Sequence, residues 1–229
     1  MGRPQVSKDY LVVTGLKINF TFSYEDWVSQ FDTNVFGTIK LTRALLPHFR
    51  QRRSGTLVFI SSLSGWIGHS DCGAYAASKF ALEGKPRGYR SILGLFFDHK
   101  PGAVEGLQRE TAHLGIKTLL IEPGRFRTKL LSASNMKAVP SKIPEYEISS
   151  KDKMEGLAAE NQAQPGDPKK LVKIVLDLVR NEGIAEGKDI PFRLPLGTDC
   201  YDEIEAKCKE TLGMLQEWAP IIRSTEYSK

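Results

Sequence analysis

The sequence is poor in the features that mark membrane, secreted and metal-binding chains. None of its apolar runs approaches the roughly 18 residues that a membrane-spanning helix needs. It has only three cysteines, which cannot all pair and do not show the spacing of metal ligands. The first residues lack the apolar core of a secretory signal. We therefore expect a reduced, cytoplasmic chain with no membrane partner and no metal site.

An excess of charge of one sign is also nearly absent. The 32 lysines and arginines exceed the 27 acidic residues by only five, and the sequence pI is near 9.0. This balance permits anionic ligands such as nucleotides, but the basic residues are scattered among acidic ones. We expect no nucleic-acid partner. A nucleic-acid-binding module is a third alternative, to be tested by salt-sensitive retention on DNA.

The length and the pattern of apolar residues predict one α/β domain over residues 1–229. Short β-rich runs predict buried strands at 9–15, 56–62 and 116–122, and an edge strand at 191–197. Helical spacing, caps and breakers predict helices that begin after Ser23 and lie at 31–50, 74–84, 104–110, 169–180 and 201–218. Residues 132–168 predict a long loop or short helices. Strands that alternate with helices favour a doubly wound, parallel sheet.

The chemistry is concentrated around two residues four apart, Tyr75 and Lys79, which share one face of a helix. A free phenol has a pKa near 10, and an adjacent ammonium lowers that pKa so that tyrosine becomes a usable acid/base. Ser62 ends a strand and could hydrogen-bond the oxygen that Tyr75 protonates, while Asn34 could hold a water that links Lys79 to solvent. This set suits carbonyl–alcohol interconversion with a hydride-carrying cofactor.

Several motifs together resemble the short-chain dehydrogenase/reductase family. They are Thr-Asn-Val-Phe-Gly at 33–37, the 13-residue step from Ser62 to Tyr75, Tyr-x-x-x-Lys, and Pro123-Gly124-x-x-x-Thr128. The resemblance covers residues 24–84 and 104–218, and residues 192–199 look like the C-terminal strand and loop of fungal-type members. It implies a Rossmann-like fold and NAD(P)(H)-dependent oxidation or reduction.

The resemblance also implies roles, residue by residue. Asn34, Ser62, Tyr75 and Lys79 form the catalytic tetrad, and Lys79 bonds the nicotinamide ribose. Pro123 and Gly124 shape the turn beneath the nicotinamide, while the backbone near Phe126 and the Thr128 hydroxyl hold its carboxamide. The implied cofactor is NADP, with NAD as the alternative. The implied partners are a small-molecule carbonyl or alcohol, bound with the help of the 129–167 region, and further copies in a homodimer or homotetramer.

The first departure from the family concerns the cofactor half. Relatives have Thr-Gly-x-x-x-Gly-x-Gly after the first strand, whose glycines let backbone and helix N-terminus approach the pyrophosphate. Here Thr14-Gly15 is followed by Leu16-Lys17-Ile18-Asn19, with no glycine before Gly37. Only 33 residues precede Asn34, where three βα units need about 90. We therefore expect residues 1–22 to be a remnant of the first strand, in a truncated domain that lacks much of the glycine-loop half and binds its cofactor weakly.

The second departure is an insertion at residues 85–102, inside the helix that carries Tyr75 and Lys79. Joining Gly84 to Ala103 restores a continuous helical sequence. We hypothesise that these 18 residues are a retained intron or a loop bulging from the helix. Sequencing of the transcript distinguishes the two.

Two interpretations of the whole chain follow. In the first it is an NAD(P)-dependent oxidoreductase with Tyr75 as the acid/base. In the second it is a catalytically impaired remnant that acts, if at all, as an interaction subunit. At single positions the ordinary alternatives are a satisfied helix polar residue for Asn34, a turn former for Ser62 and a helix cap for Thr128. Ser61 is interpreted as a turn residue.

Overall fold

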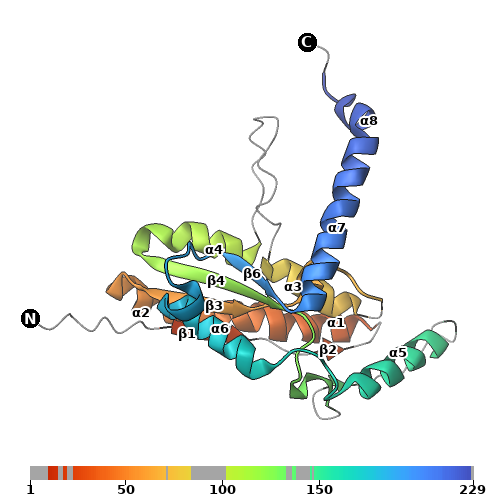
Figure 1. Cartoon of the computed structure of the whole chain (residues 1–229), viewed down its shortest axis with the longest axis horizontal. Coiled ribbons are helices and arrows are strands. Elements are labelled where there is room, and N and C mark those ends of the chain that lie inside the picture. The colour runs from red at the N-terminus through yellow and green to blue at the C-terminus, as the bar shows by residue number, and fades with distance from the viewer. Residues whose placement is uncertain are drawn as a thin grey trace, which may run out of the picture.

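A four-stranded parallel sheet forms the centre of the molecule (Figure 1). The computed structural model describes residues 10–14, 18–19, 23–70, 72–83, 102–132, 136–137, 145 and 147–227. The sheet order is β1-β3-β4-β6, with strands Tyr10–Thr14, Gly55–Ile60, Ile116–Pro123 and Arg193–Leu196. A separate parallel pair joins β2 (Ile18–Asn19) to β5 (Met136–Lys137). The predicted parallel sheet is confirmed.

Helices connect the strands and extend beyond them. They are α1 Tyr24–Phe31, the π-helix η1 Asp32–Gly37, α2 Thr38–Arg52, α3 Gly73–Glu83, α4 Ala103–Thr111, α5 Glu147–Glu160, α6 Pro168–Arg180, α7 Thr198–Glu217 and α8 Ala219–Arg223. In the described part of the chain, no helix has both the length and the apolar character for a membrane crossing.

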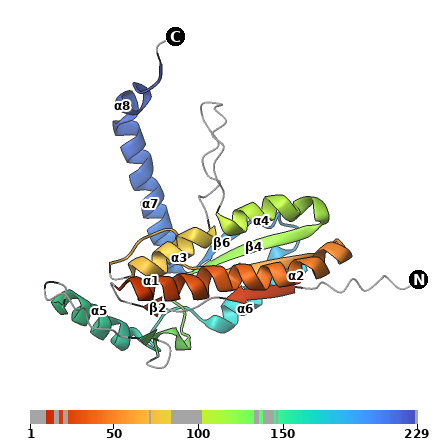
Figure 2. The ribbon, with the colours of Figure 1, turned by 180° about the vertical axis from the view of Figure 1, so that it is seen from behind.

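The sheet is covered on both faces, as the doubly wound prediction requires. Alternate side chains of a strand point to opposite faces. On one face Leu57 and Phe59 pack with residues of α2, α3 and α4, and on the other face Val58 packs with residues of α6 such as Val175. Figure 2 shows α2, α3 and α4 together on the side seen from behind.

All four strands of the sheet are parallel, so their carboxyl ends meet at one edge. Ser61 and Ser62 follow β3, Pro123 ends β4, and Gly197 follows β6 at this edge. The strands lie across the sheet in the same order as in the sequence, so the strand order does not reverse within this sheet. Ligand contacts are therefore expected along one edge rather than at a switch point between two halves.

Helices α3 and α4 follow one another along the same side of the sheet in both views (Figures 1 and 2). This course agrees with the helix obtained by joining Gly84 to Ala103. The predicted insertion at 85–102 falls almost wholly on residues 84–101, which lie outside the described part. Its origin therefore stays a prediction.

Three boundaries differ from the sequence-based expectation. Strand β3 ends at Ile60 rather than at residue 62, because the chain turns into a short 3₁₀ helix, Leu63–Gly65. The region 132–168 contains α5, 14 residues long, which is longer than the expected short helices. The last long helix begins at Thr198, three residues before the predicted start.

Candidate functional site

Ser62 is held at the carboxyl edge of the sheet by its neighbours. The Ser61 backbone N–H donates to the Ile121 carbonyl at 2.7 Å, which continues the pairing of β3 with β4 beyond the strand end. Ser62 is extended, and its Oγ accepts from the Ser64 N–H at 3.1 Å as the cap of the 3₁₀ helix. Ser62 therefore forms a turn, as the ordinary alternative for this residue predicts, and the same hydrogen bond fixes its hydroxyl in position.

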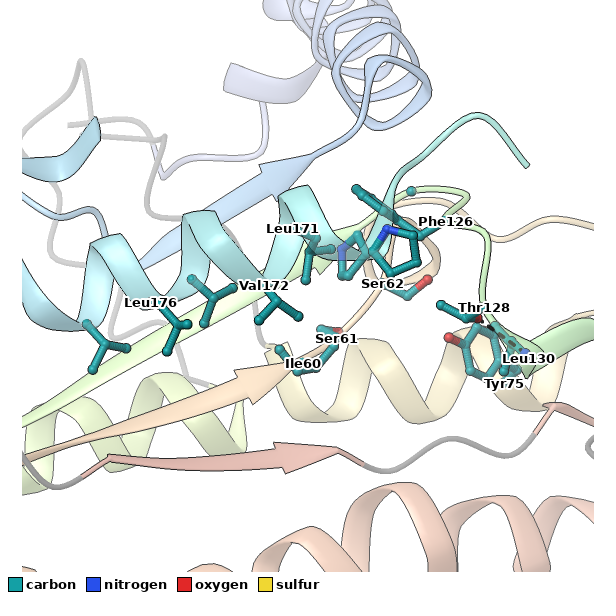
Figure 3. A pocket seen from close by; sticks show the side chains of 15 residues that line it. Ile60, Ser61, Ser62, Tyr75, Phe126, Thr128, Leu130, Leu171, Val172 and Leu176 are labelled. Carbon is teal, nitrogen blue, oxygen red and sulfur yellow. Dashed lines mark hydrogen bonds between the residues drawn. The ribbon is translucent and has the colours of Figure 1, made fainter. Parts of the chain in front are cut away.

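Ser62 and Tyr75 line the same pocket, which has a volume of about 350 Å³ (Figure 3). Tyr75 lies in the first turn of α3 and is 5% exposed. The Tyr75 and Thr128 hydroxyls lie at one end of the pocket, and Val172 and Leu176 of α6 lie toward the other. Folding thus brings Ser62 and Tyr75, 13 positions apart in the sequence, to one cavity.

Six of the eight predicted site residues line this pocket: Ser62, Tyr75, Pro123, Gly124, Phe126 and Thr128. The other two, Asn34 and Lys79, lie next to it, fully buried. In the rest of the lining only Ser61 is polar, and the aliphatic side chains come mainly from α6. The pocket therefore has a small polar end and a large apolar remainder.

Lys79 lies beneath the pocket. Its Nζ donates to the Ile60 carbonyl at 3.2 Å and lies 5.6 Å from the centroid of the Tyr75 ring. Burial lowers the pKa of Lys79 to about 8, and the nearby Glu83 carboxylate acts in the opposite direction. The ammonium therefore sits against the ring face and the end of β3.

The acidity of Tyr75 differs from the expectation that Lys79 lowers it. Burial raises the pKa of Tyr75 to about 12, and the side-chain hydrogen bond with Ser62 offsets only part of the rise. The physical reason is that desolvation of the phenolate outweighs the hydrogen bond, while the Lys79 ammonium lies over the ring and bonds the Ile60 carbonyl. In this structure Tyr75 is a neutral phenol at pH 7.

Asn34 lies on the π-helix between α1 and α2, a feature that the sequence pattern did not reveal. Its Nδ2 donates to the Ser78 Oγ at 3.0 Å, and Ser78 Oγ donates to the Tyr75 carbonyl at 2.7 Å. Asn34 Oδ1 is buried with no hydrogen-bond partner in the described structure. An acceptor of this kind fits a bound water, so the relay role stays a prediction that the geometry permits.

Thr128 is both a helix cap and a pocket residue. Its Oγ1 accepts from the Leu130 N–H at 3.2 Å, which caps the short helix Lys129–Leu131, and its side chain lines the pocket. The turn before it is braced by Asp199, which accepts from the Arg125 N–H at 2.7 Å. The segment from Pro123 to Thr128 is thus fixed against the start of α7.

The residues present fit the nicotinamide end of the implied cofactor better than its pyrophosphate. Ser62, Tyr75 and Thr128 line the pocket, and their hydroxyls are suitable hydrogen-bond partners for the nicotinamide ring and its carboxamide. The described helix that follows the first strand, α1, begins instead with Glu25 and Asp26 in its first turn, and its cap is filled by Ser23. Carboxylates at a helix N-terminus repel a pyrophosphate, so this helix does not provide the expected anion site.

Sequence reasoning missed a group of buried polar residues behind the pocket: Ser61, Glu83, Glu122 and Arg193. Both carboxylates are completely buried. One signal was available, because Glu122 directly follows the apolar run 119–121 of a predicted buried strand, where an unpaired acid is very costly.

Three comparisons relate the chain to known proteins. A model of the short chain dehydrogenase family matches residues 13–91, which include all four proposed tetrad residues. The chain is 31% identical to the uncharacterized oxidoreductase YusZ of Bacillus subtilis, over 76% of this chain and 54% of the relative. It is 29% identical to a 3-ketodihydrosphingosine reductase of Bacteroides thetaiotaomicron, over 76% of this chain and 55% of the relative.

A solved structure agrees over nearly the whole chain. The crystal structure of a short-chain dehydrogenase from Streptomyces avermitilis superposes with a TM-score of 0.71 at 29% identity. The superposition covers 95% of this chain and 71% of that one. The chain spans about half the length of the curated relatives that it matches.

Proposed function

We propose that this chain is a short-chain dehydrogenase/reductase that reduces a carbonyl to an alcohol with Tyr75 as the proton donor, a proposal supported by its similarity to that family. The observation that carries the proposal is the shared pocket of Ser62 and Tyr75 at the carboxyl edge of the sheet. The reverse reaction, alcohol oxidation, uses the same residues.

The state of Tyr75 favours the reducing direction. With a pKa near 12, the phenol keeps its proton at neutral pH until a stronger base appears beside it. A substrate alkoxide is such a base, and the phenol oxygen can protonate it across a hydrogen bond. The Ser62 hydroxyl donates a second hydrogen bond to the same substrate oxygen and orients it.

Lys79 and Asn34 support this transfer from beneath. The Lys79 ammonium lies over the Tyr75 ring and stabilises the phenolate that remains after proton donation. Asn34, through its free Oδ1, would hold a water for the return of the proton. The role of Lys79 at the nicotinamide ribose is implied by the family only, because its side chain does not line the pocket.

A nicotinamide cofactor bound here would supply the hydride. Pro123, Gly124, Phe126 and Thr128 are the residues that would hold the ring, since they line the same pocket as Tyr75. We propose NADP rather than NAD on the resemblance of residues 192–199 to fungal-type members. We assign none of the described residues to the pyrophosphate.

The pocket favours a carbonyl on an apolar skeleton. Beyond the hydroxyls at one end, it is walled by aliphatic side chains such as Leu171, Val172 and Leu176 (Figure 3). A polar or charged substrate would lose its hydration there without gaining partners. The name of the Bacteroides relative, 3-ketodihydrosphingosine reductase, agrees with a ketone as the substrate.

The test compares purified chain with Tyr75→Phe in the reduction of a panel of aliphatic and aromatic ketones by NADPH. Tyr75→Phe removes the acidic proton and should lower kcat by 10²-fold or more. The matched control is Tyr201→Phe, which alters an exposed tyrosine on α7 and should leave turnover unchanged. Equal turnover by Tyr75→Phe and wild type would refute the assignment.

The second candidate function is the impaired remnant acting as an interaction subunit. The acidic, self-capped start of α1 favours it, and the sequence between Gly15 and Ser23 contains no further glycine to replace the missing phosphate loop. Calorimetric titration with NADPH separates the two candidates. Absence of binding at millimolar cofactor supports the remnant, while binding together with turnover supports the enzyme.

Self-association belongs to the proposal as well. The helices that contain Asn34 and Tyr75, with their continuations, expose several apolar side chains, which include Phe36, Leu41 and Phe80. Exposed apolar residues on these helices favour pairing of two copies through them. Light scattering of wild type and of Phe36→Ser with Phe80→Ser should show a dimer or tetramer in the first and a monomer in the second.

A further inference from the structure

A buried ionic cluster lies directly behind the pocket, and the proposed reaction leaves it unused. Arg193 on β6 reaches Glu83 at the end of α3 with an Nη2–Oε2 distance of 3.1 Å. Its Nε lies 3.0 Å from Oε1 of Glu122 on β4. Both carboxylates are fully buried, and only 13% of the arginine side chain is exposed. One arginine thus joins a helix and two strands.

The carboxylate of Glu83 also reaches the third strand. The Ser61 hydroxyl donates to Glu83 Oε1, and Ser61 stands immediately before Ser62. Room for this contact exists because residue 65 is glycine: a Cβ there would overlap the Glu83 carboxylate. Ser61 and Ser62 both line the pocket. The contact with Glu83 fixes the Ser61 side chain, and through the backbone it thereby holds the next residue, Ser62, at the pocket.

The same residue is tied to Tyr75 and Lys79 through its helix. Glu83 lies one turn beyond Lys79 and two turns beyond Tyr75 on α3, so the three share one face. Glu83 thus links the helix with the acid/base pair to the strand end with the serine. It also places a carboxyl group beside the buried Lys79.

We propose that Glu83 is a positioning residue of the proposed reaction, which holds Ser62 in line with Tyr75 through Ser61 and keeps Lys79 as an ammonium. This inference rests on the proposed function. Arg193 and Glu122 complete the device by holding the Glu83 carboxyl group in place.

The charges around Glu83 explain how the device works. Facing it are Tyr75 and Lys79 on α3, Glu122 on β4, Arg193 on β6 and Cys200 on α7. Burial and the nearby Glu122 raise the pKa of Glu83 to about 8, which is also near the pKa of Lys79. As pH approaches 8, Glu83 ionises, and its new charge opposes loss of the Lys79 proton. The ammonium therefore persists to higher pH than burial alone would allow.

The test measures Lys79 directly. In full-length chain with ¹⁵N-lysine, the Nζ titration of Lys79 is assigned with Lys79→Arg, and the pH profile of kcat is recorded beside it. Glu83→Gln should lower the Lys79 midpoint by about one pH unit, a tenfold change in the ammonium-to-amine ratio. The alkaline limb of kcat should move with it. Ser61→Ala removes a hydrogen bond that lowers the pKa of Glu83, so it should lower kcat and move the Lys79 midpoint less than Glu83→Gln does.

A second variant makes a prediction of the opposite sign. Glu122→Gln leaves Glu83 as the sole carboxylate of Arg193, so Glu83 ionises at lower pH and the Lys79 midpoint should rise. Glu105→Gln is the control, since Glu105 is another buried acid, paired with Arg109 on α4 at 2.7 Å. It should change neither the midpoint nor the pH profile.

The outcomes separate this inference from the proposed function. A Lys79 midpoint that is the same in wild type, Glu83→Gln and Glu122→Gln overturns the inference, whatever the turnover. If the Lys79 midpoints move as expected but the chain shows no turnover, the charge coupling is supported and the proposed function is refuted. If Glu83→Gln does not fold, by circular dichroism, Glu122→Gln alone decides.

Discussion

The free energy of unfolding should depend on pH in a way that is unusual for an acidic residue. The pKa of Glu83 rises from 4.5 to about 8 in the folded chain, because burial and Glu122 disfavour its charge. Between these values the folded chain holds a proton that the unfolded chain has already lost. Stability therefore falls as pH rises through this window.

The magnitude follows from one bound proton. Each pH unit in the window costs about 1.4 kcal/mol for one proton held only by the folded state. From pH 5 to pH 8 the loss is about 4 kcal/mol, an upper figure because the two carboxyl groups share one arginine. This is a large part of the 5–15 kcal/mol that an ordinary domain has.

Lysine 79 contributes with the opposite sign at higher pH. Burial lowers its pKa from 10.5 to about 8, so above pH 8 the unfolded chain holds the extra proton. Stability from this group is lowest below pH 8 and recovers between 8 and 10.5. The two groups together predict a minimum of stability near pH 8.

The assay is urea unfolding, followed by circular dichroism, at half-unit steps from pH 5 to pH 9 for wild type, Glu83→Gln and Glu105→Gln. Wild type and Glu105→Gln should lose stability together toward pH 8, whereas Glu83→Gln should show a flatter curve, by up to one proton. Parallel curves for all three proteins would refute the raised pKa of Glu83 and with it the charge account of the cluster.

Three substitutions test single contacts. Gly65→Ala forces a methyl group against the Glu83 carboxylate and should destabilise the fold by about 1–3 kcal/mol in urea titrations, with no change if the space is open. Asn34→Ala removes the buried hydrogen bond to Ser78 and should cost about 1–3 kcal/mol in the same assay. Asp167 caps α6, since its Oδ1 accepts from the Lys169 N–H at 2.8 Å. Asp167→Ala should therefore lower the free energy of unfolding by about 1 kcal/mol and leave turnover unchanged.

Much of the site was predictable because its geometry is local. Tyr75 and Lys79 share a helix face as a direct result of their spacing, and the strand before Ser62 is recognisable as a short apolar run. The Asp167-Pro168 start of α6 has the cap and first-turn proline of the sequence signature. Parallel strands then bring their carboxyl ends to one edge without further information.

What could not be predicted depends on burial and on distant pairs. The expected fall in the Tyr75 pKa reversed to a rise, since its sign is decided by desolvation and by the place of Lys79 over the ring. Ser61 looked like a turn residue because Glu83, 22 positions later, is its partner only in the folded chain. Arg193 meets Glu83 across 110 positions, a pairing that no local pattern encodes.

The division between the two ends of the cofactor leads to a last prediction. The groups that would face the nicotinamide come from β3, α3 and β4, whereas α1, the described helix after the first strand, begins with acids and does not line the pocket. If the ring end alone is recognised, most of the dinucleotide adds little binding energy. Reduced nicotinamide mononucleotide should then support ketone reduction with a KM within about threefold of that for NADPH, a difference under 1 kcal/mol. An NADPH KM lower by 10²-fold or more would mean that other groups of this chain bind the adenosine and pyrophosphate, and would refute the division.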